Sequence, residues 1–588
     1  MEGSSDKKIT QPLSRPKGGF RTMPFIIANE AFERVASHGL MPNMILYLMK
    51  EYNMSTATGT SILFYWSALT NFMPIIGAFL SDSCLGRFAL IGLGSISSLL
   101  GMILLWLTTM VPQAKPLSCN APSERCQSPT PAQLVLLFSS FCLMSVGAGG
   151  IRACSMAFGA DQLDQRDKPA NKRVLESFFN WYYALTTFSV LVAITLIVYI
   201  QDHMGWKVGF GIPAILMLLS TLLFFLASSF YVKMNANKSL LTGFIQVLVV
   251  AFKNRRLMFP PNNSNRQYHH RRGSSLVEPT DKLRFLNKAC IIRNEEDLTP
   301  EGTASKPWSL CTVEQVEELK AIIKVVPLWS TGIMIAINSN QSTFPVLQAK
   351  SMDRHITPNF EIPAGSFAMF SVGTLTIWVI VYDRVVLPLL KKLTGKPHRL
   401  SVKQRMGIGL VLSCVAMAVS AVVEKVRRRA AIRQGLSDQP QAIVDMSAMW
   451  LVAQHCLTGL AEAFNAIGQM EFYYSQLPKS MSSIATALFG LGMAIANLLA
   501  SVIVKAVDEV TKRGGKESWV SSNLNKGHYD YYYWLLAVMG SVNFLYFLVC
   551  SWAYGSSEEP VMRDSNEGAE MRVRNLSRSR ELRVIASP

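Results

Sequence analysis

The sequence predicts an all-α membrane protein in which about twelve transmembrane helices form two bundles of six. Half of the 588 residues are hydrophobic and only 16% are charged, which lies outside the usual range of a soluble chain. Apolar stretches of about 20 residues, each long enough to cross about 30 Å of hydrocarbon, recur along the whole chain. They lie near 26–49, 60–81, 87–111, 132–157, 177–200, 207–232, 321–348, 364–390, 406–424, 447–474, 484–507 and 531–554.

A polar segment separates the first six stretches from the last six, and its Lys and Arg outnumber its Asp and Glu. Residues 1–24 show neither the apolar core nor the cleavage site of a signal peptide, so we expect the first membrane helix to direct insertion. The expected organisation is a cytoplasmic tail (1–24), a first bundle (25–232), a cytoplasmic basic linker (233–318), a second bundle (319–555) and a cytoplasmic tail (556–588).

The charge distribution supports a cytoplasmic amino terminus, because this orientation keeps the basic linker and the terminal tails inside. One loop disagrees. The stretch VEKVRRRAAIR (423–433) is basic but falls outside in a twelve-span count, so either one span is misplaced or the ninth helix extends beyond the membrane. The net charge of +18 is then a response to topology and to the anionic inner leaflet, and we expect no nucleic-acid partner.

Motifs of soluble enzymes are missing from the sequence, which contains no Walker loop, HExxH or GxSxG and no CxxC pair for zinc. A membrane enzyme is disfavoured because the ionisable residues lie at scattered depths in different helices. We therefore expect no enzyme and no cofactor or metal, with protons as the only coupling ion. Cys119 and Cys126 share a predicted outer loop, LSCNAPSERC, where they could form a disulfide or remain unpaired thiols.

The first apolar stretch contains the segment ANEAFERVASHGLMPNMILYLM, which carries Glu30, Glu33, Arg34 and His38. A charge at the centre of a bilayer costs about 2.5–3.5 kcal/mol on insertion scales, so these residues need partners. Their spacing places all four on one stripe of a helix. Two neighbouring carboxyls cannot both ionise cheaply, so we expect one to bind a proton while Arg34 offsets the other. The alternative is a static ion pair that holds the helix in place.

Several further motifs occur in a fixed order along the chain. Asp82, Gly86 and Arg87 form a D-x-x-x-G-R turn, which is similar to that of the major facilitator superfamily, and Thr312 and Gln315 can form a capping box. The others are GAGGIRACSMAFGADQLD, FFNWYY, GQMEFYYSQLPKSM and NLNKGHYDYYYWLLA. Together they resemble the plant nitrate/peptide transporter family, the plant branch of the proton-dependent oligopeptide transporters. NSNQSTFPVLQAKSMDR more weakly resembles its first subfamily.

This resemblance implies a major facilitator fold and assigns roles to individual residues. The family's E-x-x-E-R/K motif, associated with proton coupling, matches Glu30, Glu33 and Arg34. The family's basic residue on the fourth helix, commonly Lys, falls on Arg152. An Arg fork suits a planar anion such as nitrate or a carboxylate. The alternative for Arg152 is a side chain that snorkels to the cytoplasmic face.

The tenth helix places Glu462 at the position of the family's intramembrane glutamate. The resemblance implies a gate in which Arg152 and Glu462 join the two bundles, or alternatively a pair fixed within one rigid unit. Asn338 and Ser339 lie near the position at which the best-known nitrate carrier of the family has a substrate-binding His, and no His is present here. The aromatic residues of FFNWYY (178–183) are more often packing residues than a substrate cage.

We expect a proton-coupled symporter of a small anionic solute, with nitrate as the leading substrate. Peptides, gibberellin, abscisic acid and glycosides are alternatives, as is a nutrient sensor that does not transport. The expected location is the plasma membrane, with the vacuolar membrane as the alternative, and membrane lipid surrounds the protein. Ser274 follows an Arg pair in the linker, where a basic-directed kinase could phosphorylate it. Neither the substrate nor the oligomeric state follows from the sequence.

Overall fold

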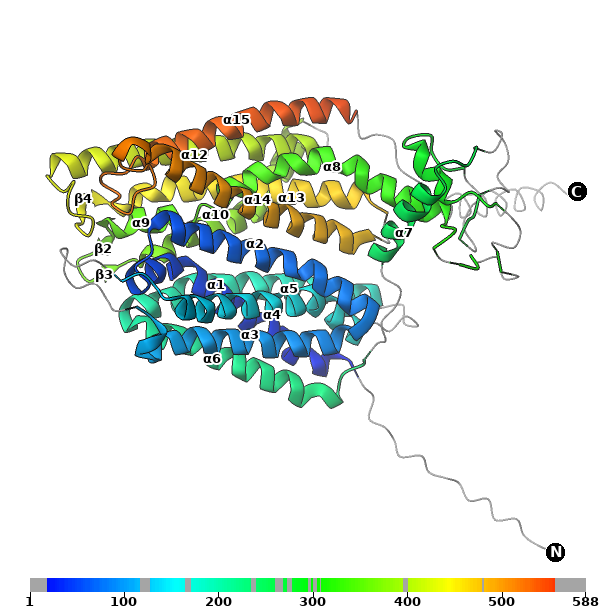
Figure 1. Ribbon diagram of the computed structural model, residues 1–588, viewed down its shortest axis with the longest axis horizontal. Coiled ribbons are helices and arrows are strands. Elements are labelled where there is room, and N and C mark those ends of the chain that lie inside the picture. Colours follow the sequence, from blue (N-terminus) through cyan, green and yellow to red (C-terminus); the bar gives the residue numbers. More distant parts are fainter. Residues whose placement is uncertain are drawn as a thin grey trace, which may run out of the picture.

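The computed structural model describes residues 18–116, 127–163, 171–233, 240–259, 268–271, 278–293, 298–299, 304–306, 308–394, 400–478 and 481–555, most of which are helical (Figure 1). The first half forms α1 (Met23–Glu51), α2 (Thr56–Leu80), α3 (Arg87–Met110), α4 (Pro131–Leu163), α5 (Asn171–Val192) and α6 (Val198–Leu226). The second half forms α8 (Val313–Ser339), α9 (Thr343–Lys350), α10 (Ala368–Val381), α11 (Leu387–Thr394), α12 (Val402–Arg433), α13 (Leu451–Gln476), α14 (Ser482–Thr511) and α15 (Tyr529–Ala553).

Helix α7 (Leu240–Lys253) lies between these halves in sequence and packs against α8 at one end of the molecule (Figure 1). The opposite end carries α9 and four short strands, β1 (Met352–Asp353), β2 (His355–Thr357), β3 (Phe360–Glu361) and β4 (Val444–Ser447). β1 pairs with β4 in parallel, and β2 pairs with β3 antiparallel. We call these two ends the linker end and the strand end.

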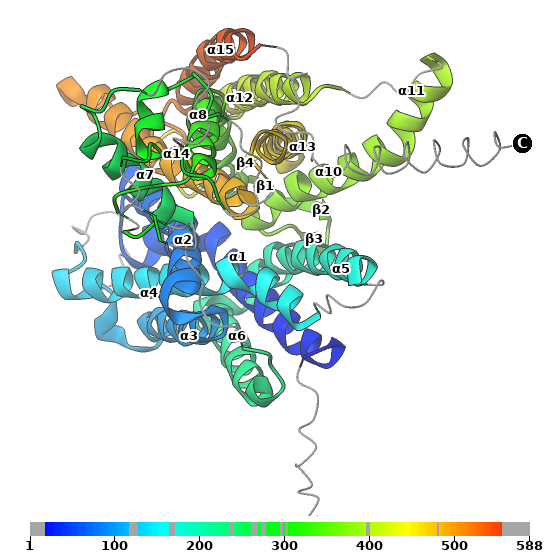
Figure 2. The same cartoon turned by 90° about the vertical axis from the view of Figure 1, so that its right-hand side faces the viewer.

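Viewed from the linker end, the helices separate into two groups (Figure 2). Helices α1 to α6 form one group and α8 with α10 to α15 form the other, so the structure is the expected all-α membrane fold. Helix α8 begins at Val313, before the expected start of the second bundle at 319. The capping box explains this start, since Gln315 N donates to Thr312 Oγ1 and Thr312 N donates to Gln315 Oε1.

Nine helical segments in the described part of the chain are long and apolar enough to cross a membrane. One of them, at Ser177–Ser229, runs from α5 through the π-helical turn Ala193–Ile197 into α6. Gly205, inside α6, has a φ of 78° and kinks the segment into two helices. Helices α1 and α13, with 29 and 26 residues, have the length to cross but too many polar residues to qualify by composition. Adding the split segment and these two helices gives the twelve spans that the sequence predicts.

Helix α12 explains the basic stretch that conflicted with the charge rule. Its 32 residues, Val402–Arg433, correspond to about 48 Å at the usual rise of an α-helix, well beyond the hydrocarbon thickness. The ninth helix therefore extends past the membrane. Arg427, within the basic stretch, is fully buried, so it does not act as a surface charge at all.

Small residues allow close helix packing in the first half. A Cβ on Gly77 of α2 would stand 2.3 Å from the Gly149 carbonyl oxygen of α4, and a Cβ on Gly147 would stand 2.3 Å from Ser98 Oγ of α3. Backbones that approach this closely gain dispersion contacts, which replace the hydrophobic driving force that lipid cannot supply. These contacts hold α2, α3 and α4 together as one unit.

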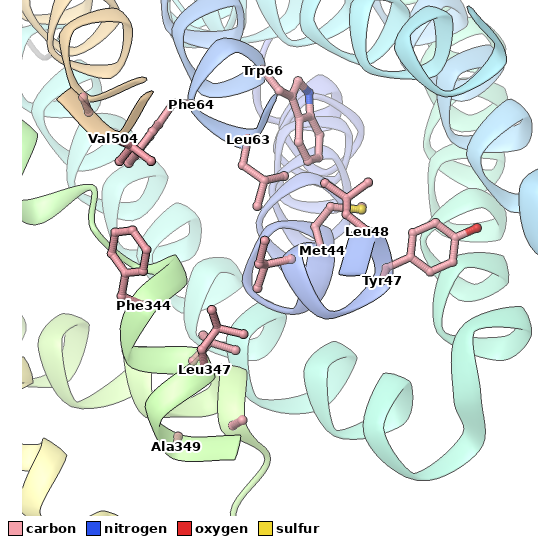
Figure 3. Close-up of a cluster of buried hydrophobic side chains, with 14 of the residues drawn as sticks. Met44, Tyr47, Leu48, Leu63, Phe64, Trp66, Phe344, Leu347, Ala349 and Val504 are labelled. Atoms are coloured by element: carbon pink, nitrogen blue, oxygen red, sulfur yellow. The ribbon is translucent and has the colours of Figure 1, made fainter. Parts of the chain in front are cut away.

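The two halves meet in a shared apolar cluster near the strand end (Figure 3). Met44, Leu48 and Leu63 of the first half share this cluster with Phe344 and Val504 of the second half. Helix α2 also packs along α14, and Lys505 Nζ donates to Tyr65 Oη at 3.0 Å. Buried apolar surface and this polar contact therefore close the seam between the halves toward the strand end.

Three residues with expected roles lie outside the described residues. These are Cys119 and Cys126, expected to share an outer loop, and Ser274, the expected phosphorylation site. Their roles remain predictions.

Candidate functional site

Helix α1 carries the ionisable stripe expected from the sequence. Glu30 and Glu33 are both fully buried. Arg34 Nε donates a 2.8 Å hydrogen bond to Glu30 Oε1, one turn earlier, and His38 Nδ1 lies 3.2 Å from the Arg34 carbonyl oxygen. Glu30 thus has its counter-charge within the same helix.

Glu33 is paired with a different helix. Arg152 of α4 donates from Nε to Glu33 Oε2 at 3.1 Å and from Nη2 to Glu33 Oε1 at 3.0 Å. The same Nη2 donates to Ser37 Oγ at 2.6 Å. In this conformation each carboxylate has its own arginine, Arg34 for Glu30 and Arg152 for Glu33, and the uptake of a proton by one of the two carboxyls remains a prediction. Arg152 is held inside the first half and does not snorkel to the surface.

The expected contact between Arg152 and Glu462 is not formed in this structure. The Arg152 guanidinium is already occupied by Glu33 and Ser37. Glu462 of α13 instead faces Ser339 of α8, and no charged partner acts on it among the described residues. The two residues thus belong to separate polar sites, one in each half.

Asn338, expected near a substrate-binding position, lies on α8 and contacts α12. Its Nδ2 donates to Ser413 Oγ of α12 at 2.9 Å, and its side chain is buried inside the second half. Its neighbour Ser339 is the one that approaches Glu462. The two adjacent residues therefore face different helices, and a role of either one in substrate binding remains a prediction.

His455 was not predicted as a site residue, although it lies two turns before Glu462 on α13. Its Nδ1 stands 3.2 Å from Ser371 Oγ of α10, and its buried Nε2 has no hydrogen-bond partner in the described part of the chain. The spacing of seven residues between His455 and Glu462 places both on one helix face and was the available sequence signal. The described residues contain no group of three acidic, His or Cys side chains arranged for a metal.

The aromatic residues of α5 divide into two sets. Phe178 and Tyr182 are buried and their rings lie 5.9 Å apart, as expected for packing residues. Trp181 and Tyr183 are exposed by 65% and 57%. Tyr182 also approaches the Glu30 carboxyl group, so one packing residue borders the ionisable stripe of α1.

Polar contacts join the two halves at the strand end. Arg354, in the turn after β1, donates from Nη1 to Asp202 Oδ2 of α6 at 3.3 Å, and Lys350 Nζ stands 4.0 Å from the same carboxylate. A second contact joins the backbone N–H of Thr56, which donates to Ser522 Oγ at 3.1 Å. Two loops of the second half therefore reach across to the first half.

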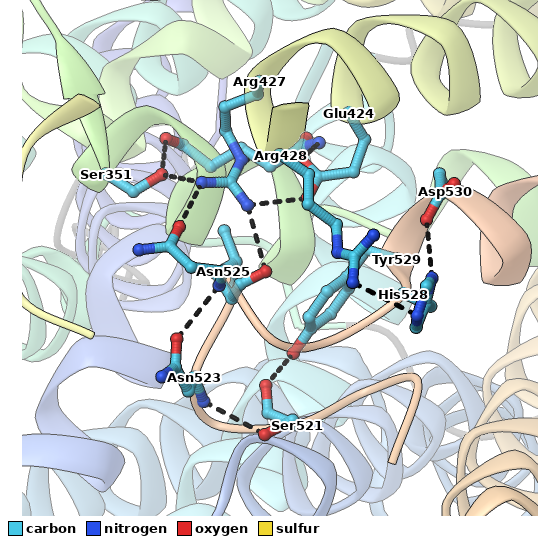
Figure 4. A network of polar contacts seen from close by, with 12 residues as sticks. Ser351, Glu424, Arg427, Arg428, Ser521, Asn523, Asn525, His528, Tyr529 and Asp530 are labelled. Carbon is cyan, nitrogen blue, oxygen red and sulfur yellow. Dashed lines mark hydrogen bonds and ion pairs between the residues drawn. The ribbon is translucent and has the colours of Figure 1, made fainter. Parts of the chain in front are cut away.

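A buried polar network, drawn in Figure 4, contacts both of these loops. Arg427 donates from Nε and Nη2 to both oxygens of Glu424, at 2.9 and 2.8 Å. Its Nη1 donates to Asn525 Oδ1 at 2.8 Å and to Ser351 Oγ at 3.3 Å, and its Nη2 also donates to the Leu524 carbonyl oxygen at 3.0 Å. Five contacts match the five N–H donors of a guanidinium.

His528 borders this network at the start of α15 (Figure 4). Its Nε2 lies 3.2 Å from Arg428 Nη2, its Nδ1 lies 3.6 Å from Asp530 Oδ1, and its ring stacks on Tyr531. Burial, together with the positive charge of Arg428, lowers the pKa of His528 below its ordinary value of 6.5. The neutral imidazole is thus the favoured form in the folded chain.

Comparison with known proteins supports the resemblance seen in the motifs. The model of the POT family matches residues 88–520. The Arabidopsis thaliana proteins NRT1/PTR FAMILY 1.2 and NRT1/PTR FAMILY 1.1 are 59% and 57% identical to the chain, covering 93% and 96% of it and 91% and 96% of their own lengths. A third relative, NRT1/PTR FAMILY 2.13 of the same plant, is 40% identical over 93% of this chain and 90% of its own.

Solved structures show the same fold at low sequence identity. The crystal structure of an auto-inhibited POT family peptide transporter is 20% identical and superposes with a TM-score of 0.67, covering 92% of this chain and 99% of that one. A POT family transporter in complex with 5-aminolevulinic acid is 14% identical, with a TM-score of 0.60 over 92% of this chain and 99% of its own.

Proposed function

Because the chain belongs to the POT family and is therefore a membrane transporter rather than an enzyme, we propose that it is a proton-coupled symporter of a small anionic solute. Nitrate is the leading substrate. The observation that carries the proposal is the bidentate contact between Arg152 and Glu33, with Ser37 as a further acceptor.

Coupling follows from a competition for one guanidinium. An ionised Glu33 occupies the fork of Arg152 with both of its oxygens. Protonation of Glu33 removes its charge and weakens its hold, which leaves the fork available to an anion. A proton on Glu33 therefore raises the affinity of Arg152 for the anion, and by linkage the anion raises the affinity of Glu33 for the proton.

The chemistry of these donors sets the substrate class. A guanidinium presents two parallel N–H donors that match the oxygens of nitrate or of a carboxylate. Ser37 Oγ stands 2.6 Å from Arg152 Nη2 and could donate a further hydrogen bond to the same anion. A small planar anion fits this group of donors without any contribution from the second half of the molecule.

The cycle requires the two halves to open alternately at each end. Here the apolar cluster and the Asp202 contacts join the halves at the strand end, which is the outer end in the proposed orientation. This arrangement supports a conformation closed outside, from which the solute leaves toward the linker end.

A zwitterionic solute such as a peptide is the second candidate, and Glu462 favours it. Its carboxyl group faces Ser339 and has no charged partner among the described residues. It could therefore receive the ammonium group of a substrate whose carboxylate binds Arg152. A nitrate carrier has no such need for Glu462.

The test is uptake by purified protein in liposomes, with an inward proton gradient and a panel of nitrate, dipeptides, gibberellin, abscisic acid and a glycoside. Gradient-driven nitrate uptake that Glu33→Gln abolishes supports the proposal. Glu51→Gln is the matched control, because Glu51 pairs with Lys115 outside the site. Uptake of dipeptides alone would favour the second candidate, and binding without any uptake would indicate a sensor.

Two further expectations accompany the proposal. The plasma membrane is the proposed location, and a fluorescent fusion seen at the vacuolar membrane would contradict it. Ser274 is the proposed site of a kinase, which Ser274→Ala and Ser274→Asp test directly. Transport equal to that of the parent in both variants, under kinase activation, would contradict this regulation.

A further inference from the structure

Helix α12 buries Arg427 completely, in a region that carries none of the proposed proton or substrate contacts. A fully buried charge is costly unless every donor is satisfied. The carboxylate of Glu424 neutralises the guanidinium, and Gln348 Nε2 donates to the same carboxylate at 2.7 Å. The remaining donors of Arg427 are directed at two loops.

The first loop is the segment after α9. Ser351 Oγ accepts from Arg427 Nη1, while the Ser351 carbonyl oxygen accepts from Val444 N at 2.9 Å, where β4 begins. Three residues further on, Arg354 donates to Asp202 in the other half. The position of Ser351 thus sets where Arg354 can reach.

The second loop joins α14 to α15. Arg427 binds the Leu524 carbonyl oxygen and Asn525 Oδ1, and Asn525 Nδ2 donates to the Leu436 carbonyl oxygen at 2.9 Å. Ser522, two residues earlier, accepts the N–H of Thr56 from the other half. The Arg427 guanidinium therefore binds both loops (Figure 4). Each of these loops makes one of the two polar contacts with the first half, Arg354 to Asp202 and Thr56 to Ser522.

We propose that Arg427, neutralised by Glu424, is a positioning residue for closure of the strand end. It contacts neither substrate nor proton. By fixing Ser351 and the 524–525 loop relative to each other, it aligns Arg354 with Asp202 and Ser522 with Thr56 at the same time. The inference rests on the proposed alternating access, because it concerns the balance between closed and open forms of that end.

The test measures this closure directly. Spin labels on Lys207→Cys and Thr357→Cys, two exposed positions on opposite halves, report the width of the strand end in purified full-length protein. The accessible native cysteines are replaced by Ser. The distances are recorded without substrate or proton gradient, so failure to transport nitrate and failure of this inference are separate results.

The main variant combines Glu424→Gln with Arg427→Met, which removes both charges and leaves an acceptor for Gln348. We expect the ratio of long to short label distances to rise by about fivefold or more, with melting behaviour near that of the parent. Arg427→Lys keeps the charge beside Glu424 but can contact only part of the two loops. Its ratio of long to short label distances should therefore lie between those of the parent and the double variant. A distance distribution identical to that of the parent in a folded double variant overturns the proposal.

An alternative variant and a matched control complete the design. If the double variant does not fold, Ser351→Ala with Asn525→Ala removes the side-chain contacts to both loops while keeping the buried ion pair, and an unchanged distribution there is equally decisive. The matched control is Arg405→Met with Glu471→Leu, which removes an ion pair from the other end of α12. A strand end that opens equally in this control would show a general loss of packing and would overturn the specific role of Arg427.

Discussion

Arg152 and Glu33 form two hydrogen bonds, at 3.1 and 3.0 Å, although 119 residues separate them in the chain. The contact joins α4 to α1 within the first half of the molecule. A guanidinium held in this way cannot also receive an anion through the same fork. The carboxylate is thus a built-in competitor of the proposed substrate.

Glu33→Gln should remove the acid stimulation of uptake. The amide cannot take up the proton, and it does not compete for Arg152 as a charged group. Coupling free energies of this kind usually correspond to about 5–150-fold changes in affinity, so the parent should take up the anion measurably faster at pH 5.5 than at pH 7.5. In the variant this difference in uptake rate should disappear. Initial uptake rates in liposomes at both pH values measure this. Acid stimulation that persists in the variant would exclude Glu33 as the proton acceptor.

Arg152→Ala should lose anion binding and also lower stability, because Glu33 would remain as an uncompensated buried charge. Breaking a buried pair in this way typically costs about 3–5 kcal/mol. Arg152→Lys should retain part of both properties, and Arg152→Ala combined with Glu33→Gln should recover stability without binding. Thermal unfolding and anion titration of the three variants separate the effects. Anion affinity equal to the parent in Arg152→Ala would place the binding site elsewhere.

Asp202→Asn should weaken closure of the strand end only modestly. Partly exposed ion pairs contribute about 0.2–1 kcal/mol, so the open-to-closed ratio should rise by less than about fivefold, below the rise expected for the Arg427 double variant. The label pair at positions 207 and 357 measures the shift. Asp438→Asn, which removes an ion pair to Lys526 within the second half, is the control and should leave the distances unchanged. A shift in the open-to-closed ratio as large as that of the Arg427 double variant would contradict the prediction that Asp202 contributes less to closure than Arg427.

His528 should make the fold less stable in mild acid. Its pKa is lowered in the folded chain, so its contribution is fully present above the ordinary value of 6.5 and is lost as the pH falls toward the lowered value. His528→Gln removes the titrating group. The melting temperature of the parent should therefore fall more steeply between pH 7 and pH 5.5 than that of the variant. Parallel curves would show that His528 does not contribute.

The sequence predicted most of the fold because apolar length is a local property. The twelve spans, the capping box at Thr312 and the extension of the ninth helix all follow from short windows of residues. Helices α1 and α13 carry Glu30, Glu33, Arg34, His455 and Glu462, which lower their hydropathy, yet their stretches near 26–49 and 447–474 are long enough to be predicted as spans.

The pairing of side chains could not be predicted from spacing. Arg34 and Arg152 are both suitable partners for the two carboxyls of α1, and only the packing of α4 against α1 assigns one arginine to each. Asn338 and Ser339 are adjacent in sequence but face different elements, which depends on the rotation of α8. Arg427 looked like one of several surface charges, because its partners come from loops about 75 to 100 residues away.

The 119 residues between Glu33 and Arg152 in the sequence also have a consequence for biosynthesis. At a translation rate of about 5–20 residues per second, roughly 6–24 seconds pass between the synthesis of Glu33 and that of Arg152. During this interval α1 must be accommodated at the insertion machinery with a carboxyl group that lacks its partner. Stable integration of α1 should therefore await α4, and nascent chains truncated before residue 131 should be extracted from membranes by alkaline carbonate more easily than longer ones.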